Sequence, residues 1–227
     1  MSVLLLLGPP GAGRSVLTNR LAQVLDFAWV PARELLRSAA LEPGGSAVLL
    51  RLHLEAGAPV PAALAMEVVT QHLQRVPWAN GAVLDGFPQD LKQAKALDKW
   101  LAAQGRRPSR ALRLELPQVE VLRRLSGRRH CRSCPHGRYN IFDEPALHLD
   151  RCTLCRAPLH QRLRDREDVV LQRIRRRNVE ELPLELYYRE AGLLERIDAS
   201  GDSASVLARI VERVGSTAPP LDRRQVA

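Results

Sequence analysis

The residues best suited to chemistry lie close to the start of the chain, in a turn rich in glycine. Gly8, Gly11 and Gly13 follow an apolar run, and Arg14-Ser15 come directly after them. A glycine-rich turn that opens a helix presents unpaired backbone N–H groups and the positive end of the helix dipole to an anion. The spacing is that of the phosphate-binding P-loop, G-x-x-x-x-G-K-[ST], with arginine in the lysine position. We therefore expect this turn to bind phosphate.

Arg14 is the residue that distinguishes this turn from the usual motif. Its guanidinium keeps the positive charge of lysine, but the planar group is bulkier and is not an equivalent replacement. A turn without a ligand is the alternative, and the order of strand, turn and helix favours the phosphate site. The extent of any catalysis then depends on how Arg14 is accommodated.

A second group of reactive residues consists of the four cysteines. They form two Cys-x-x-Cys pairs with 17 residues between the pairs: Cys131, Cys134, Cys152 and Cys155. Paired thiols at this separation are typical of a tetrahedral structural zinc site, whereas four free cysteines are the alternative. Because four thiols fill such a site, we expect the neighbouring His130, His136 and His160 to be surface residues and not ligands.

Asp85 ends a short apolar run at 82–84 and is followed by Gly86. Carboxylates at the carboxyl end of a strand beside a P-loop are linked to magnesium in phosphoryl-transfer sites. An aspartate in an ordinary Asp-Gly turn is the alternative. The presence of the P-loop favours the magnesium-linked acid.

The elements that would carry these residues alternate between strands and helices. Strands are expected at 3–7, 27–30, 82–84, 111–116 and 194–197. After the P-loop helix, which begins with Leu17 and Leu21 in helical spacing, further helices are expected at 31–37, 47–56, 62–75, 91–104, 119–125, 169–177, 182–193 and 203–214. This alternation predicts an α/β fold with a buried parallel sheet, interrupted between 127 and 165.

Composition limits the class of protein. The 227 residues fit one domain with insertions, and 45% hydrophobic content is enough for a sizeable core. A net charge of +9 indicates polyanionic partners, either nucleotides or nucleic acid, and the P-loop favours nucleotides. No apolar run reaches the length of a membrane span, and the first seven residues lack the basic region of a signal peptide. We expect a cytoplasmic protein that binds no membrane.

Six motifs occur in the order and spacing of one protein family. They are GPPGAG at 8–13, LLR at 35–37, EAGAPVP at 55–61, NGAVLDGFP at 80–88, GRR at 127–129 and the Cys-x-x-Cys pair. Over nearly the whole chain the sequence resembles the adenylate kinases, in their long form with a zinc-binding lid.

The resemblance implies the P-loop nucleoside monophosphate kinase fold, a parallel five-stranded sheet flanked by helices, with a small helical NMP-binding lobe and a zinc-ribbon-like lid. The parts that it implies are a core at 1–30, 61–126 and 166–215, the NMP-binding lobe at 31–60, the lid at 127–165 and a tail at 216–227. It also implies transfer of the γ-phosphoryl group of ATP·Mg²⁺ to AMP, giving two ADP. We expect a monomer that carries a structural Zn²⁺, uses Mg²⁺ with ATP and has no nucleic-acid partner.

The resemblance also implies roles for individual residues. The catalytic group would be Arg14, Asp85, Arg128, Arg162 and Arg173. ATP would be bound by Gly8, Gly11, Ala12, Gly13, Arg14, Ser15, Val16, Arg124 and Arg128. AMP would be bound by Ala32, Arg37, Ala58, Pro59, Val60, Gly86, Phe87, Pro88, Gln89, Gln93, Arg162 and Arg173.

Several positions depart from the family pattern. Val16 lacks the hydroxyl of the family's threonine, although Ser15 supplies one nearby, and Gln89 stands in the position of an arginine. Arg164 replaces the first of two paired aspartates in the lid, and Asp165 keeps the second. Losing one well-placed charge typically costs orders of magnitude in rate.

Three interpretations therefore stay open. The first is a working nucleoside monophosphate kinase in which Arg14, Ser15, Arg33 or Lys92 compensates for the departures. The second is a catalytically impaired nucleotide-binding paralogue with a sensing or partner-binding role. The third, a zinc-ribbon protein that binds nucleic acid, explains the charge but not the P-loop.

Overall fold

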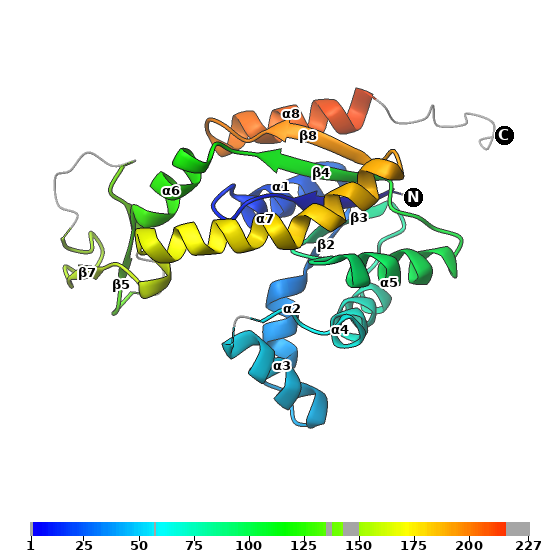
Figure 1. Ribbon diagram of the computed structural model, residues 1–227, viewed down its shortest axis with the longest axis horizontal. Coiled ribbons are helices and arrows are strands. Elements are labelled where there is room, and N and C mark those ends of the chain that lie inside the picture. Colours follow the sequence, from blue (N-terminus) through cyan, green and yellow to red (C-terminus); the bar gives the residue numbers. More distant parts are fainter. Residues whose placement is uncertain (1, 57, 135–137, 143–149, 217–227) are drawn as a thin grey trace.

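The chain folds around a parallel five-stranded sheet, as a computed structural model shows for residues 2–56, 58–134, 138–142 and 150–216 (Figure 1). The strands lie in the order β2-β3-β1-β4-β8, and all four neighbouring pairs are parallel. Their bounds are β1 Ser2–Leu7, β2 Ala28–Pro31, β3 Gly81–Asp85, β4 Arg110–Glu115 and β8 Leu194–Asp198. The predicted α/β fold class is confirmed.

Both faces of the sheet are covered by helices, which explains why β1 is apolar throughout. Leu4 and Leu6 pack on one face with residues of α1 (Arg14–Leu25) and α8 (Ser203–Ser216). Leu5 and Leu7 pack on the other face with residues of α4 (Ala62–Arg75), α5 (Leu91–Ala102) and α7 (Glu167–Glu190). A central parallel strand that is buried on two sides has to be continuously hydrophobic.

Two short helices, α2 (Ala32–Ala39) and α3 (Gly45–Glu55), project from the carboxyl edge of the sheet, next to α4 (Figure 1). The helix α6 (Gln118–Ser126) packs against α7. The sequence predicted two helices at 169–177 and 182–193, but α7 is one helix that contains Pro183. Proline removes one backbone hydrogen bond. Buried side chains on both sides of it, including Ile174 and Leu184, hold the helix against the core.

A second, smaller sheet lies at one end of the molecule (Figure 1). It is antiparallel, with β5 (Arg128–Cys131) between β6 (Arg138–Asn140) and β7 (Leu159–His160), and a short 3₁₀ helix, Leu163–Asp165, follows it. Most of the predicted tail lies outside the described residues. No helix of the described part has both the length and the apolarity needed to cross a bilayer.

The prediction that His130 is a surface residue is wrong. Its side chain is buried, and its Nε2 lies 3.2 Å from the buried carboxylate of Asp165. Burial lowers the pKa of His130, although Asp165 acts in the opposite direction. The histidine therefore connects the small sheet to the segment that leads into α7. His160 is half-buried, and His136 lies outside the described residues.

Candidate active site

The glycine-rich turn connects β1 to α1 at the carboxyl edge of the sheet. Gly8 has φ 136°, and a Cβ there would lie 2.8 Å from the carbonyl oxygen of Leu114. Gly13, with φ 76°, forms the N-cap of α1, so that Arg14 begins the helix. Among the described residues, the N–H groups of Gly11, Gly13, Arg14 and Ser15 donate to no protein acceptor. These free donors at a helix start are suited to bind an anion.

The side chain of Arg14 leaves this turn toward α7, where it meets a buried acid. Its Nη1 lies 3.9 Å from Glu181, whose side chain is only 5% exposed. Arg113 of β4 donates to the other carboxylate oxygen of Glu181 at 2.6 Å and lies 2.9 Å from Glu185. Arg177 lies 4.0 Å from Glu181, one helical turn away. Burial lowers the pKa of Arg14, and Glu181 acts against this shift.

Asp85 ends β3 and lies at the same edge of the sheet. In the strand register it is opposite Leu6 of β1 and Pro31 of β2, and its side chain is largely buried. Its carboxylate is close enough to Arg14 to interact with it electrostatically. The structure thus brings the predicted magnesium-linked acid and the P-loop arginine together.

The segment after β3 is held by Gln93, whose side chain is almost fully buried. The Gln93 carboxamide accepts from the backbone N–H of Gln89 at 2.8 Å and donates to the carbonyl oxygen of Val60 at 2.9 Å. Both polar groups of Gln93 therefore have protein partners. Ala32 and Phe87 are also buried, whereas Ala58 and Pro59 are exposed.

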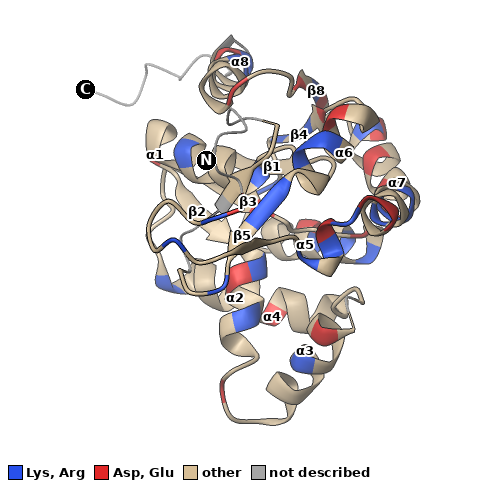
Figure 2. Ribbon diagram, turned by 90° about the vertical axis from the view of Figure 1, so that its left-hand side faces the viewer, with Lys and Arg blue, Asp and Glu red and all other residues tan. Residues whose placement is uncertain are grey.

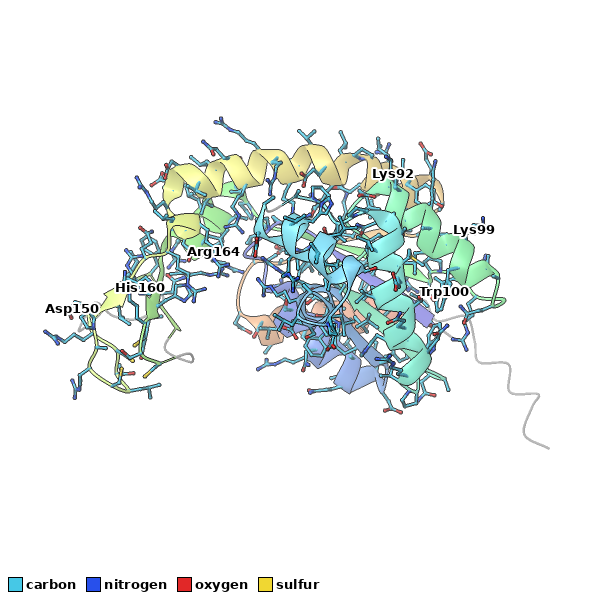
Figure 3. The ribbon with its side chains drawn as sticks, turned by 90° about the horizontal axis from the view of Figure 1, so that it is seen from below. Lys92, Lys99, Trp100, Asp150, His160 and Arg164 are labelled. Carbon is cyan, nitrogen blue, oxygen red and sulfur yellow. The ribbon has the colours of Figure 1, made fainter. Side chains whose placement is uncertain are left out.

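Five arginines from α2 and the region around α7 lie close enough for the other four to act electrostatically on Arg33: Arg33, Arg37, Arg164, Arg173 and Arg177. Burial lowers the pKa of Arg33, and the positive charges of the other four lower it further. Arg173 donates to the carbonyl oxygen of Arg164 at 2.9 Å, and burial lowers its pKa as well. Figure 2 shows basic residues on α2, α7 and β5, and Figure 3 shows Arg164 between the small sheet and the core. So many cations in one place attract a polyanion.

The remaining predicted arginines have different surroundings. Arg128, at the start of β5, lies within electrostatic reach of Arg173. Arg162 is exposed and interacts electrostatically with His130. Arg124 is bound to Glu120 at 2.8 Å and to the carbonyl oxygen of Gly201 at 3.1 Å. The side chain of Val16 is half exposed on α1.

The four cysteines converge at the end of the small sheet. Their sulfur atoms all lie within 4.8 Å of one another, and Cys131 and Cys155 are 3.4 Å apart. The N–H of Cys134 donates to the sulfur of Cys131 at 3.3 Å. Tyr139 lies with its hydroxyl 3.3 Å from Cys152, and this hydrogen bond lowers the pKa of that thiol to about 6. The predicted metal-ligand set is therefore assembled.

Comparison with known proteins gives a consistent result. The sequence model of the adenylate kinase family matches residues 6–193. The chain belongs to the adenylate kinase family. It is 34% identical over 212 residues to an adenylate kinase of Syntrophobacter fumaroxidans, covering 93% of this chain and 99% of that protein. It is 36% identical over 208 residues to an adenylate kinase of Acidothermus cellulolyticus, covering 92% of this chain and 95% of that protein.

Membership of this family makes the chain a phosphotransferase with a nucleotide-binding fold. Against this background, the charged group around Glu181 is the part of the site that sequence reasoning missed. Two signals were available in the sequence. Glu181 occupies the buried stripe of α7, between the buried Ile174 and Leu184, and Arg113 lies between the buried Leu112 and Leu114 of β4. Charges in such positions need partners.

Proposed function

We propose that the chain is a nucleoside monophosphate kinase that transfers the γ-phosphoryl group of ATP·Mg²⁺ to AMP, giving two ADP. One observation supports this most: the P-loop donors, Asp85 and the arginines of α2 and α7 all meet at one edge of the sheet. Phosphoryl transfer depends on charge neutralisation and alignment more than on covalent chemistry by the protein.

In this proposal the two substrates approach from opposite sides. The P-loop from Gly8 to Val16 holds the ATP phosphates, and Asp85 orients water of the magnesium ion. Arg37 and Arg173 bind the AMP phosphate, and Arg128 and Arg162 close on the transferring group from the lid. The small lobe formed by α2 and α3 takes up AMP, and Gln93 orders the loop that lines its pocket through Val60 and Gln89.

We further propose that the four cysteines hold a structural zinc ion. Thiolates at about 2.3 Å from zinc in a tetrahedron are about 3.8 Å apart. The sulfur separations, all within 4.8 Å, fit this arrangement. With four protein ligands there is no open position for catalysis, so that the metal would stabilise the lid and Mg²⁺ would accompany ATP.

The experiment that tests the reaction is a coupled assay for ADP formation with ATP·Mg²⁺ and AMP, CMP, UMP or GMP offered separately. We expect AMP to be the preferred acceptor. Comparable turnover of CMP or UMP would show that the assignment of the acceptor pocket to adenine is wrong. Absence of ADP with every acceptor would reject the transfer.

A second candidate function is nucleotide binding with little or no transfer. It is favoured by the position of Arg14, which interacts with Glu181, and by Gln89, which supplies no charge to an acceptor phosphate. This candidate predicts ATP binding without ADP formation in the same assay. A role in sensing or partner binding would then replace catalysis.

A further inference from the structure

Glu181 is a buried carboxylate at the phosphate-binding edge of the sheet. Its Oε2 accepts a 2.6 Å hydrogen bond from Arg113, whose position is also fixed by Glu185 at 2.9 Å. Its Oε1 lies 3.9 Å from the Arg14 guanidinium and 4.0 Å from that of Arg177. One carboxylate therefore neutralises Arg113 at close range and attracts the P-loop arginine at longer range.

Three residues of this group, Arg14, Arg177 and Glu181, line a small hollow between the P-loop side and the acceptor side of the site. Its lining consists of Leu7, Arg14, Gly86, Pro88, Gln89, Arg177, Glu181 and Leu184. The carboxylate thus borders the space toward which Arg14 and Arg177 also turn. Any phosphate oxygen placed there would meet both the arginines and the acid.

The acids of this group balance its arginines. Three guanidinium groups, Arg14, Arg113 and Arg177, face the carboxylates of Glu181 and Glu185, and the carboxylate of Asp85 also attracts Arg14. An arginine that is sheltered from water requires a counter-charge. Glu181 supplies that counter-charge to Arg14.

We propose that Glu181 sets the nucleotide affinity of this site, as an internal counter-ion of Arg14 with which a nucleotide phosphate has to compete. The proposal rests on the proposed function in one respect, namely that Arg14 contacts a phosphate of the bound nucleotide. Glu181 touches no reacting atom and acts through Arg14, so it is a positioning residue. Its presence weakens ATP binding and speeds release of nucleotide.

The Glu181 carboxylate has two opposing effects on nucleotide affinity, and the larger one decides whether its presence tightens or weakens binding. By holding Arg14, Glu181 reduces the side-chain entropy that is lost when nucleotide binds. By remaining negative beside the phosphate, it repels the ligand and shares the charge of Arg14. For unit charges about 4 Å apart in a partly buried site, the electrostatic effect exceeds the rotamer entropy of one arginine. Removal of the charge is therefore expected to tighten binding.

Calorimetric titration of the full chain with ATP·Mg²⁺ tests this expectation. Glu181→Gln keeps the shape of the side chain and removes its charge, and we expect its Kd to fall about tenfold or more. Glu185→Gln is the matched control, because Glu185 binds the same Arg113 and makes no ion pair with Arg14 among the described residues. Its Kd should stay within about twofold of the wild type.

The variant Arg14→Gln shows whether Glu181 acts through the arginine. In that background, Glu181→Gln should change Kd by less than about threefold, since two residues that share one interaction are not additive. A Kd for Glu181→Gln that is unchanged or higher than in the wild type overturns the proposal, and so does equal tightening without Arg14. A purely structural role would loosen binding or leave it unaltered.

Two further points keep the test decisive. Should Glu181→Gln fail to fold, Glu181→Asp retains the charge for Arg113 while withdrawing it from Arg14, and a smaller fall in Kd is expected. An unchanged or higher Kd for Glu181→Asp then overturns the proposal.

Because the experiment measures ATP binding, its result does not depend on turnover. Tighter ATP binding by Glu181→Gln without any ADP formation by the wild type would support this inference and reject the proposed transfer; no ATP binding by any variant would reject both.

Discussion

Gln89 and Arg33 together show how charge is distributed on the acceptor side. Gln89 contributes a neutral side chain to the hollow next to Arg14, and its backbone is fixed by Gln93. Arg33, on the exposed side of α2, adds a cation close to Arg37. A positive charge is therefore absent at one position of the loop and present on the neighbouring helix.

Placing a positive charge at residue 89 tests whether Arg33 fully compensates for the neutral Gln89. Gln89→Arg adds a guanidinium in the proposed AMP pocket, and a charge-assisted contact contributes about 1.5–3 kcal/mol. We expect the KM for AMP to fall about ten- to a hundredfold, with the KM for ATP unchanged, in steady-state initial rates. Weaker AMP binding would mean that repulsion from the existing arginines outweighs the new contact.

At the scale of elements, the contact between α5 and α7 contains a half-buried carboxylate with only one of its two oxygens hydrogen-bonded in the described part of the chain. Tyr187 donates to the Asp98 carboxylate at 2.7 Å, while the other oxygen of Asp98 is buried with no hydrogen-bond partner among the described residues. Burial raises the pKa of Asp98, and the hydrogen bond from Tyr187 offsets part of this shift. The interface therefore holds a carboxylate that is costly to ionise.

This cost predicts a pH dependence of stability. Because the pKa of Asp98 is higher in the folded state than its ordinary value of 3.8, its contribution lowers stability as pH rises from that value through the folded pKa. Asp98→Asn removes the ionisation and keeps an acceptor for Tyr187. We expect its Tm to gain on the wild type more at pH 7 than at pH 4 in melting scans. An equal difference at both pH values would contradict this expectation.

The small sheet supplies a second prediction at this scale. Its three strands contain two to four residues each, so we expect its folding to depend on the proposed metal. Purified protein should contain about one equivalent of zinc, and Cys152→Ser should lose it and melt at a lower temperature. Metal analysis measures the zinc content, and melting scans compare the Tm of Cys152→Ser with that of the wild type. A metal-free protein whose β5–β7 amides keep their protection from hydrogen exchange would refute the structural role.

At the scale of the whole molecule, nucleotide binding should stabilise the fold. The N–H groups at the start of α1 are free to donate to a phosphate, whether residue 14 is lysine or arginine. At ATP concentrations about a hundredfold above Kd, binding to the native state adds about 2.7 kcal/mol. We expect a rise of several degrees in Tm with ATP·Mg²⁺ and none with adenosine. No shift with ATP would reject the P-loop interpretation.

Much of this architecture follows from local sequence patterns, and the exceptions have one physical cause. The apolar run of β1 and the four cysteines are signals within short stretches, so the sheet and the metal-ligand set could be predicted. Glu181 and Arg113 are 68 residues apart, and His130 and Asp165 are 35 apart. Pairing of buried charges over such distances depends on the tertiary fold, and polarity alone misleads about burial. The roles of individual site residues stay predictions.

The continuity of α7 has a mechanical consequence. The helix runs from the small sheet to the far edge of the core without interruption (Figure 1). Arg173 and Glu181 are eight residues apart on it, a span of about 12 Å at 1.5 Å per residue. A rigid helix moves as one body, so a displacement of α7 at Arg173 also displaces Glu181, which faces Arg14. We therefore expect a tilt of α7 to change the distance between Glu181 and Arg14, so that the binding of ligand near Arg173 and the binding of ligand near Arg14 would influence each other's free energy.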